Sequence, residues 1–211
     1  QFMNIIKQVA EKKTSLLLVC CWISVQLFFL ITKGITLEFE AGKYINEAYL
    51  LLNEGHLSSK NLWFYSFQIL LLAAAIKTKI GFTFVYLVQL LINAASTIIF
   101  YRLCKRFSSS RAALIATLLL IFNLPLQELN VYLQTESIFV SFTIFFSYIL
   151  LSLSSINKRT VLIISLCLFI LSITRPNGLM IIPAALIFLY LKSIRRFSFS
   201  RQVFVAASLS I

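Results

Sequence analysis

Long uncharged apolar runs separated by short charged segments dominate this chain. Runs of such length predict α-helices that cross a membrane, because about 20 apolar residues span a hydrocarbon core of about 30 Å. The pattern therefore predicts an all-α, polytopic transmembrane helix bundle that forms a single domain over residues 1–211. The predicted spans are residues 16–31, 80–101, 112–126, 137–153, 161–174, 179–191 and a last run, cut off by the end of the sequence, over 202–211.

One shorter apolar segment, residues 62–76, decides the topology. Its length covers only about 22 Å, which is less than a hydrocarbon core. If it stays on the outer side, thirteen of the nineteen Lys and Arg residues gather on the opposite side of the membrane. Because Lys and Arg favour cytoplasmic loops, we expect a cytoplasmic N-terminus and an extracytoplasmic loop over residues 32–79.

Composition supports this interpretation. The chain is 60% hydrophobic and 12% charged, with a mean hydropathy of +0.92, far from a soluble domain. Its net charge of +12 follows from the topology and does not indicate nucleic-acid binding, because no basic cluster is interleaved with a soluble fold. A Lys-rich start without a cleavage site after Ile31 predicts an uncleaved signal anchor. We expect a multi-pass protein of the bacterial inner membrane.

The acidic residues fall mainly in two segments that this topology places on the same outer face. A multi-spanning protein that gathers carboxylates on one face is expected to perform chemistry there. Six of the seven acidic residues belong to this group: Glu38, Glu40, Glu47, Glu54, Glu128 and Glu136.

Residues 40–54 predict an amphipathic helix on the outer membrane surface, ended by Gly55. On this interpretation Glu47 and Glu54 belong to a solvated face, whereas Glu40 stands beside the exit of the first span. The polar side contains Glu40, Lys43, Tyr44, Glu47 and Glu54, and the apolar side contains Ala41, Ile45, Ala48, Tyr49 and Leu52.

Glu136 and Arg175 stand at the ends of predicted spans. A carboxylate at the start of a helix is stabilised by the helix macrodipole, which alone is a sufficient role for Glu136. Arg175 follows an apolar run of about 21 Å, so it is expected to face the bundle and bind an anion. The alternative is a hairpin tip whose Arg175 side chain reaches the surface. Gln89 and Asn93 are interpreted as helix-packing residues.

The order of these features resembles the GT-C glycosyltransferases of the protein-mannosyltransferase and aminoarabinose-transferase type. These polytopic enzymes take a sugar from a polyprenyl-phosphate carrier. The resemblance extends over about residues 16–191. It rests on Glu40 followed by Tyr44, on the Tyr-Arg-Leu-x-x-Arg-Phe exit at 101–107, on Thr135-Glu136-Ser137 and on Thr-Arg-Pro-x-Gly at 174–178.

The resemblance implies transfer of a sugar from a polyprenyl-phosphate donor to a hydroxyl of a lipid, glycan or protein on the outer face. It implies that Glu40 is the general base, with Glu38 as a competitor because relatives have Asp where this chain has two Glu residues. Glu136 becomes a supporting acid or a metal ligand. A divalent cation between the acidic loops suits carboxylate chemistry, but the sequence assigns it no ligand set. Substrate binding is assigned to Arg175, with Tyr44, Lys43 and Lys79.

Two other classes remain open. A transporter of lipid-linked sugars is disfavoured because the span centres contain no Asp, Glu, Lys or Arg, whereas transporters place such residues near the midplane. A non-catalytic paralogue is suggested by Glu in place of Asp and by a sequence that stops within a span. That stop also suggests an N-terminal fragment of a longer enzyme.

Overall fold

The computed structural model describes residues 2–37, 40–153 and 157–193. The described residues are helical apart from their connections and one isolated bridge between Thr36 and Tyr132, so the all-α prediction is confirmed. The predicted last run, 202–211, lies outside them. The elements are α1 (Phe2–Lys33), α2 (Glu40–Glu54), the 3-10 helix η1 (Lys60–Tyr65), α3 (Ser66–Lys77), α4 (Phe82–Phe107), α5 (Ser110–Ile121), α6 (Leu124–Glu128), α7 (Thr135–Ser152), α8 (Lys158–Thr174) and α9 (Gly178–Ser193).

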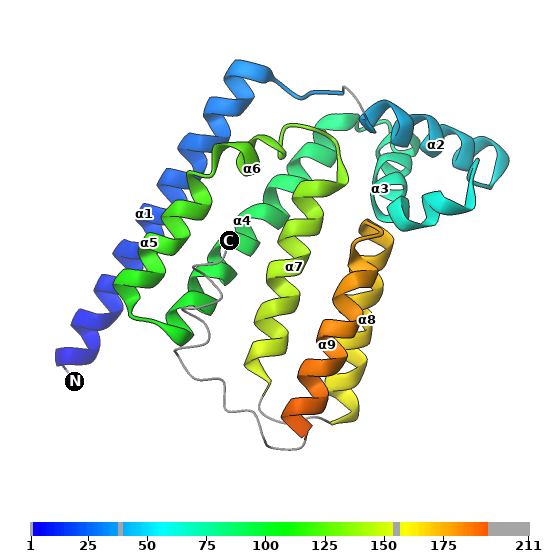
Figure 1. Cartoon of the computed structure of the whole chain (residues 1–211). Coiled ribbons are helices and arrows are strands. Elements are labelled where there is room, and N and C mark those ends of the chain that lie inside the picture. The colour runs from blue at the N-terminus through cyan, green and yellow to red at the C-terminus, as the bar shows by residue number, and fades with distance from the viewer. Residues whose placement is uncertain (1, 38–39, 154–156, 194–211) are drawn as a thin grey trace.

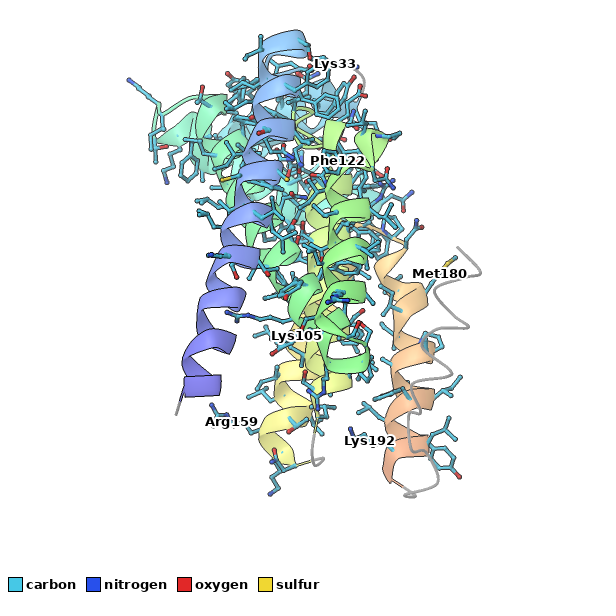
Figure 2. All side chains as sticks on the ribbon, turned by 90° about the vertical axis from the view of Figure 1, so that its left-hand side faces the viewer. Lys33, Lys105, Phe122, Arg159, Met180 and Lys192 are labelled. Carbon is cyan, nitrogen blue, oxygen red and sulfur yellow. The ribbon has the colours of Figure 1, made fainter. Side chains whose placement is uncertain are left out.

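The long helices stand side by side and have two distinct ends (Figure 1). We call the end with Lys33, the start of α7 and the α8–α9 turn the upper end. The end with the last turns of α4, α7 and α9 is the lower end. Figure 2 shows Lys33 near the upper end and Arg159 and Lys192 near the lower end.

Within the described ranges, three helical segments are long and apolar enough to cross a membrane: Lys13–Lys33, Phe82–Phe107 and Thr135–Ser152. By contrast, α3 has 12 residues, or about 18 Å, and lies with α2 at the upper end (Figure 1). The segment 62–76 therefore does not connect the two ends of the bundle.

The predicted span 112–126 is not one helix. α5 ends at Ile121, and α6 begins at Leu124 after Asn123, whose side-chain oxygen accepts a hydrogen bond from the Leu126 N–H at 3.2 Å. A capping Asn and a Pro in the next helical turn favour a new helix start. α5 is consequently a shorter apolar helix of 12 residues.

Polar side chains join the central helices. The Ser96 hydroxyl of α4 donates to the Ser141 hydroxyl of α7 at 3.2 Å, and the Trp22 indole of α1 donates to Asn93 at 2.7 Å. Gln89 donates to the carbonyls of Tyr132 and Gln134, each at 3.2 Å. Gln89 and Asn93 are thus helix-packing residues, as the sequence indicated: Gln89 fixes the start of α7 against α4, and Asn93 joins α4 to α1.

The segment after α1 is tied to the loop before α7. The Thr36 N–H donates to the Val131 carbonyl at 2.9 Å, and Lys33 forms an ion pair with Glu128. The Lys33 hydrogen bond lowers the pKa of the Glu128 carboxyl, and a 3.0 Å bond from the Tyr132 hydroxyl acts in the same direction. These contacts bring the two acidic segments of the sequence together at the upper end.

Candidate active site

The first part of the candidate site is the start of α2. Glu40 is exposed there, whereas Tyr44 is buried one turn later. The Tyr44 hydroxyl donates to Glu40 Oε2 at 2.7 Å. Burial raises the pKa of Tyr44 well above its usual range, and the hydrogen bond to Glu40 acts in the same direction. Tyr44 therefore remains a protonated donor that holds the Glu40 carboxylate.

The predicted faces of α2 are partly wrong. Tyr44 and Glu47, expected on the polar side, are buried, while Tyr49 and Leu52, expected on the apolar side, are exposed. Glu47 is buried because its carboxylate accepts hydrogen bonds from the Ser58 hydroxyl and from the Ser58 N–H, the latter at 3.0 Å. Such bonds compensate for the loss of hydration of a buried carboxylate. Glu54 is exposed, as predicted.

The second part is an ion pair between α7 and the α8–α9 turn. Arg175 Nη1 lies 2.6 Å from Glu136 Oε1, and each side chain is 23% exposed. Glu136 stands in the first turn of α7, where the macrodipole favours a carboxylate. The sequence identified both residues, but it did not indicate that they pair.

The α8–α9 turn holds Arg175 by a close backbone contact. α8 ends at Thr174, and Arg175 is extended, with φ −155° and ψ 149°. At Gly178 a Cβ atom would lie 2.3 Å from the Leu171 carbonyl oxygen. Only glycine fits this approach, so the Thr-Arg-Pro-x-Gly segment determines where the guanidinium lies.

Hydrogen-bonding capacity remains unused at the start of α7. Thr135 Oγ1, Glu136 Oε2 and Arg175 Nε are buried and have no protein partner. The residue before the helix, Gln134, makes no side-chain capping bond. Free N–H groups at a helix start, together with a guanidinium, favour an anion.

Thr135 connects the two parts of the site. Its hydroxyl lies close enough to the Tyr44 hydroxyl to act on that group's pKa, so Tyr44, which holds Glu40, lies near the residue that precedes Glu136. In the sequence, Thr135 was part of the Thr135-Glu136-Ser137 motif, but no role was predicted for it. Its signal was its position immediately before Glu136 at the start of a helix.

The remaining sequence candidates differ in position. Lys43 Nζ lies 5.7 Å from the centre of the Tyr65 ring, and that ring is 5.4 Å from the Tyr44 ring, so Lys43 borders the site. Lys79 is exposed in the α3–α4 turn, and among the described residues no ion pair connects it with the site. Glu38 lies outside the described residues.

No group of three or more His, Cys, Asp or Glu side chains within the described ranges is arranged to hold a metal ion. A cation site between the two acidic segments therefore stays a hypothesis. The described geometry instead offers a carboxylate at Glu40 and an N–H-rich start of α7 beside the Arg175 guanidinium. This combination suits proton acceptance next to an anionic group.

Comparison with known proteins gives a family but no close relative. Residues 64–211 match the family model described as dolichyl-phosphate-mannose-protein mannosyltransferase. No curated protein and no solved structure matches the chain. The matched stretch includes Thr135, Glu136 and Arg175, whereas Glu40 and Tyr44 precede it.

Proposed function

We propose that this chain, which belongs to the dolichyl-phosphate-mannose-protein mannosyltransferase family, transfers a sugar from a polyprenyl-phosphate donor to an acceptor hydroxyl. Membership of the family makes the chain a membrane glycosyltransferase of the GT-C type. The carrier lipid, the extracytoplasmic face and the acceptor are parts of the proposal. The observation that carries it is the Arg175–Glu136 pair at the start of α7, together with the Glu40 carboxylate that Tyr44 holds at the start of α2.

Arg175 is assigned to the phosphate of the donor. When the bond between the anomeric carbon and the phosphate oxygen breaks, negative charge develops on the leaving phosphate. The unpaired Arg175 Nε and the uncapped start of α7 supply N–H donors for that charge. Glu136 acts as a positioning residue that orients the guanidinium through Nη1.

Glu40 is assigned as the general base. The acceptor oxygen forms a bond with the anomeric carbon and loses its proton to the Glu40 carboxylate. Tyr44 cannot take this proton because its raised pKa keeps it protonated. A positioned carboxylate base contributes about 10² to 10⁴-fold in rate.

The upper end is assigned to the extracytoplasmic face. The described acidic side chains belong to α2, α6 and α7 at this end, whereas Arg106, Arg159 and Lys192 belong to the lower end. The preference of Lys and Arg for cytoplasmic loops supports this orientation. It places the site where a carrier lipid would present its sugar outside the cell, in a bacterial inner membrane.

The test is binding and transfer of a polyprenyl-phosphate sugar by the chain in membranes. Arg175→Ala should lose donor binding, and Arg175→Lys should keep part of it because the charge stays while the planar fork is lost. The exposed Lys77→Ala, at the same end, is the charge-matched control.

A double variant separates binding from folding. Arg175→Ala leaves the Glu136 carboxylate unpaired, so Arg175→Ala with Glu136→Gln removes both charges and restores neutrality. We expect this variant to fold as the wild type does and still fail to bind the donor. Wild-type donor binding in both Arg175→Ala variants would overturn the assignment.

A further inference from the structure

At the lower end of the bundle, two arginines have no acidic partner among the described residues. Arg102 and Arg106, near the end of α4, are exposed, and none of the ion pairs among the described residues involves them. Lys192, in the last turn of α9, donates to the Leu153 carbonyl at the end of α7. The charge of Arg106 acts on Lys192 from close by. Like charges held together, with no acidic side chain paired to them in the described ranges, favour an anionic ligand.

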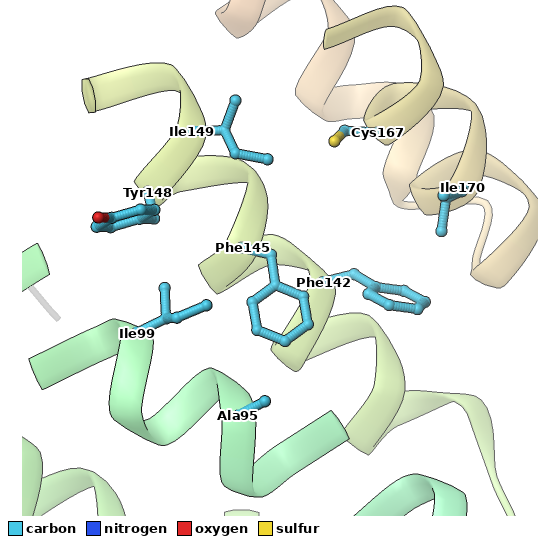
Figure 3. A pocket seen from close by; sticks show the side chains of 8 residues that line it. All are labelled: Ala95, Ile99, Phe142, Phe145, Tyr148, Ile149, Cys167 and Ile170. Atoms are coloured by element: carbon cyan, nitrogen blue, oxygen red, sulfur yellow. The ribbon is translucent and has the colours of Figure 1, made fainter. Parts of the chain in front are cut away.

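An apolar cavity lies between α4, α7 and α8. It measures about 370 Å³ and is lined by side chains that include Ile99, Phe142, Phe145, Ile149 and Cys167. Figure 3 shows Ile99 of α4 facing Phe145 of α7 across it. Its volume is that of a small-molecule site, and its lining suits a hydrocarbon chain.

The cavity and the charges lie on the same faces of their helices. Arg102 and Arg106 follow Ile99 by three and seven residues, so they continue its face of α4, with Arg106 about 10 Å nearer the lower end. On α7, Ser152 follows Phe145 by seven residues. The Ser152 hydroxyl is buried and has no protein partner.

Helix register places these groups at one level. α4 and α7 run in the same direction (Figure 1), and the Ser96–Ser141 bond fixes their offset. Extended along both helices, this offset sets Arg106 at the level of the last turn of α7, where Ser152 and Leu153 lie. A polar, cationic mouth therefore stands below an apolar cavity.

We infer that the cavity and the basic residues below it form a binding site for an anionic phospholipid, with an acyl chain against Ile99 and Phe145 and the phosphate at Arg106, Arg102 and Lys192. Basic residues between helices at the cytoplasmic face suit anionic headgroups, and guanidinium groups suit phosphate oxygens. The site lies at the end opposite Glu40 and Arg175, so its lipid is distinct from the sugar donor.

The test measures lipid retention by the purified full chain with native mass spectrometry. The chain is titrated with phosphatidylglycerol and with phosphatidylcholine of the same acyl chains, and in a third arm with a polyprenyl phosphate. Arg102→Gln with Arg106→Gln removes two charges at the lower end. Lys60→Gln with Lys77→Gln removes two exposed charges at the upper end and is the matched control.

We expect the wild type to retain phosphatidylglycerol in preference to phosphatidylcholine. The Arg102/Arg106 variant should bind it at least about tenfold more weakly, because each basic residue near an anionic lipid contributes about fivefold. The Lys60/Lys77 variant should bind as the wild type does. Ala95→Trp, which fills the cavity from α4, should weaken retention while leaving all charges in place.

Equal retention of the two phospholipids by the wild type would overturn the inference. The inference would also be overturned if retention of phosphatidylglycerol fell equally in the Arg102/Arg106 variant and in the Lys60/Lys77 control. Such a result would mean that retention depends only on the net charge of the protein. The wild type could instead retain the polyprenyl phosphate in preference to both phospholipids, and the Arg102/Arg106 variant could lose this preference. That result would assign the two arginines to the carrier lipid and would contradict the proposed phospholipid site.

Discussion

Tyr44 determines how the carboxylate at the start of α2 is held. It is buried, it donates to Glu40, and burial raises its pKa far above the ordinary value of 10.0. Because the folded protein keeps this proton while the unfolded chain releases it above about pH 10, the contribution of Tyr44 to stability is present below that pH. It is lost as the pH rises further.

Replacing Tyr44 by Phe keeps the ring and removes both the bond to Glu40 and the alkaline sensitivity. We expect transfer to fall about tenfold or more, as hydrogen bonds to charged groups contribute about 1.5–3 kcal/mol. The thermal midpoint, followed by circular dichroism between about pH 9 and 11, should fall less in Tyr44→Phe than in the wild type. An equally steep fall in both would show that Tyr44 ionises in the folded state.

The α8–α9 turn illustrates how one helix connection positions a charged group. Gly178→Ala places a methyl group against the Leu171 backbone, so α9 must shift away from α8 and carry Arg175 with it. We expect a loss of about 1–3 kcal/mol in the free energy of unfolding, as overpacked sites show, and loss of donor binding.

Gly42→Ala is the matched control for this substitution. Gly42 lies within α2, and a Cβ atom there meets nothing within 4 Å. Alanine favours a helix interior over glycine, so the thermal midpoint should stay unchanged or rise slightly. A midpoint for Gly178→Ala as high as that of Gly42→Ala would contradict the close contact.

Local sequence signals were sufficient for helices but not for contacts between them. Apolar periodicity and the cap at Gly55 predicted α2, and the Thr-Arg-Pro-x-Gly segment predicted the turn after α8. The burial of Glu47 depends on Ser58, which approaches only after the chain reverses beyond Gly55. Glu136 and Arg175 are separated by all of α7 and α8, so their pairing follows from helix packing that no local pattern contains.

At the scale of the whole molecule, the described acidic side chains lie at one end and Arg106, Arg159 and Lys192 lie at the other. The orientation of the molecule in the membrane is open to direct measurement. In a background without the four cysteines, Asn53→Cys should react with an impermeant thiol reagent added outside. Ser110→Cys should react only after permeabilisation. Both positions are exposed and lie at the upper and lower ends respectively. Labelling of Ser110→Cys from outside would reverse the orientation and move the candidate site to the cytoplasm.

Glu40→Gln is the most direct test of catalysis at the upper end, since it preserves size and hydrogen bonding but removes proton acceptance. Glu54→Gln is its control, because Glu54 is an exposed carboxylate of the same helix, whereas Glu47 is buried and unsuitable. The initial rate of sugar transfer from a polyprenyl-phosphate donor should fall by about 10² to 10⁴-fold in Glu40→Gln. Donor binding and expression should be unchanged, and Glu54→Gln should match the wild type. Equal rates for Glu40→Gln and wild type would contradict the assignment of Glu40 as the general base.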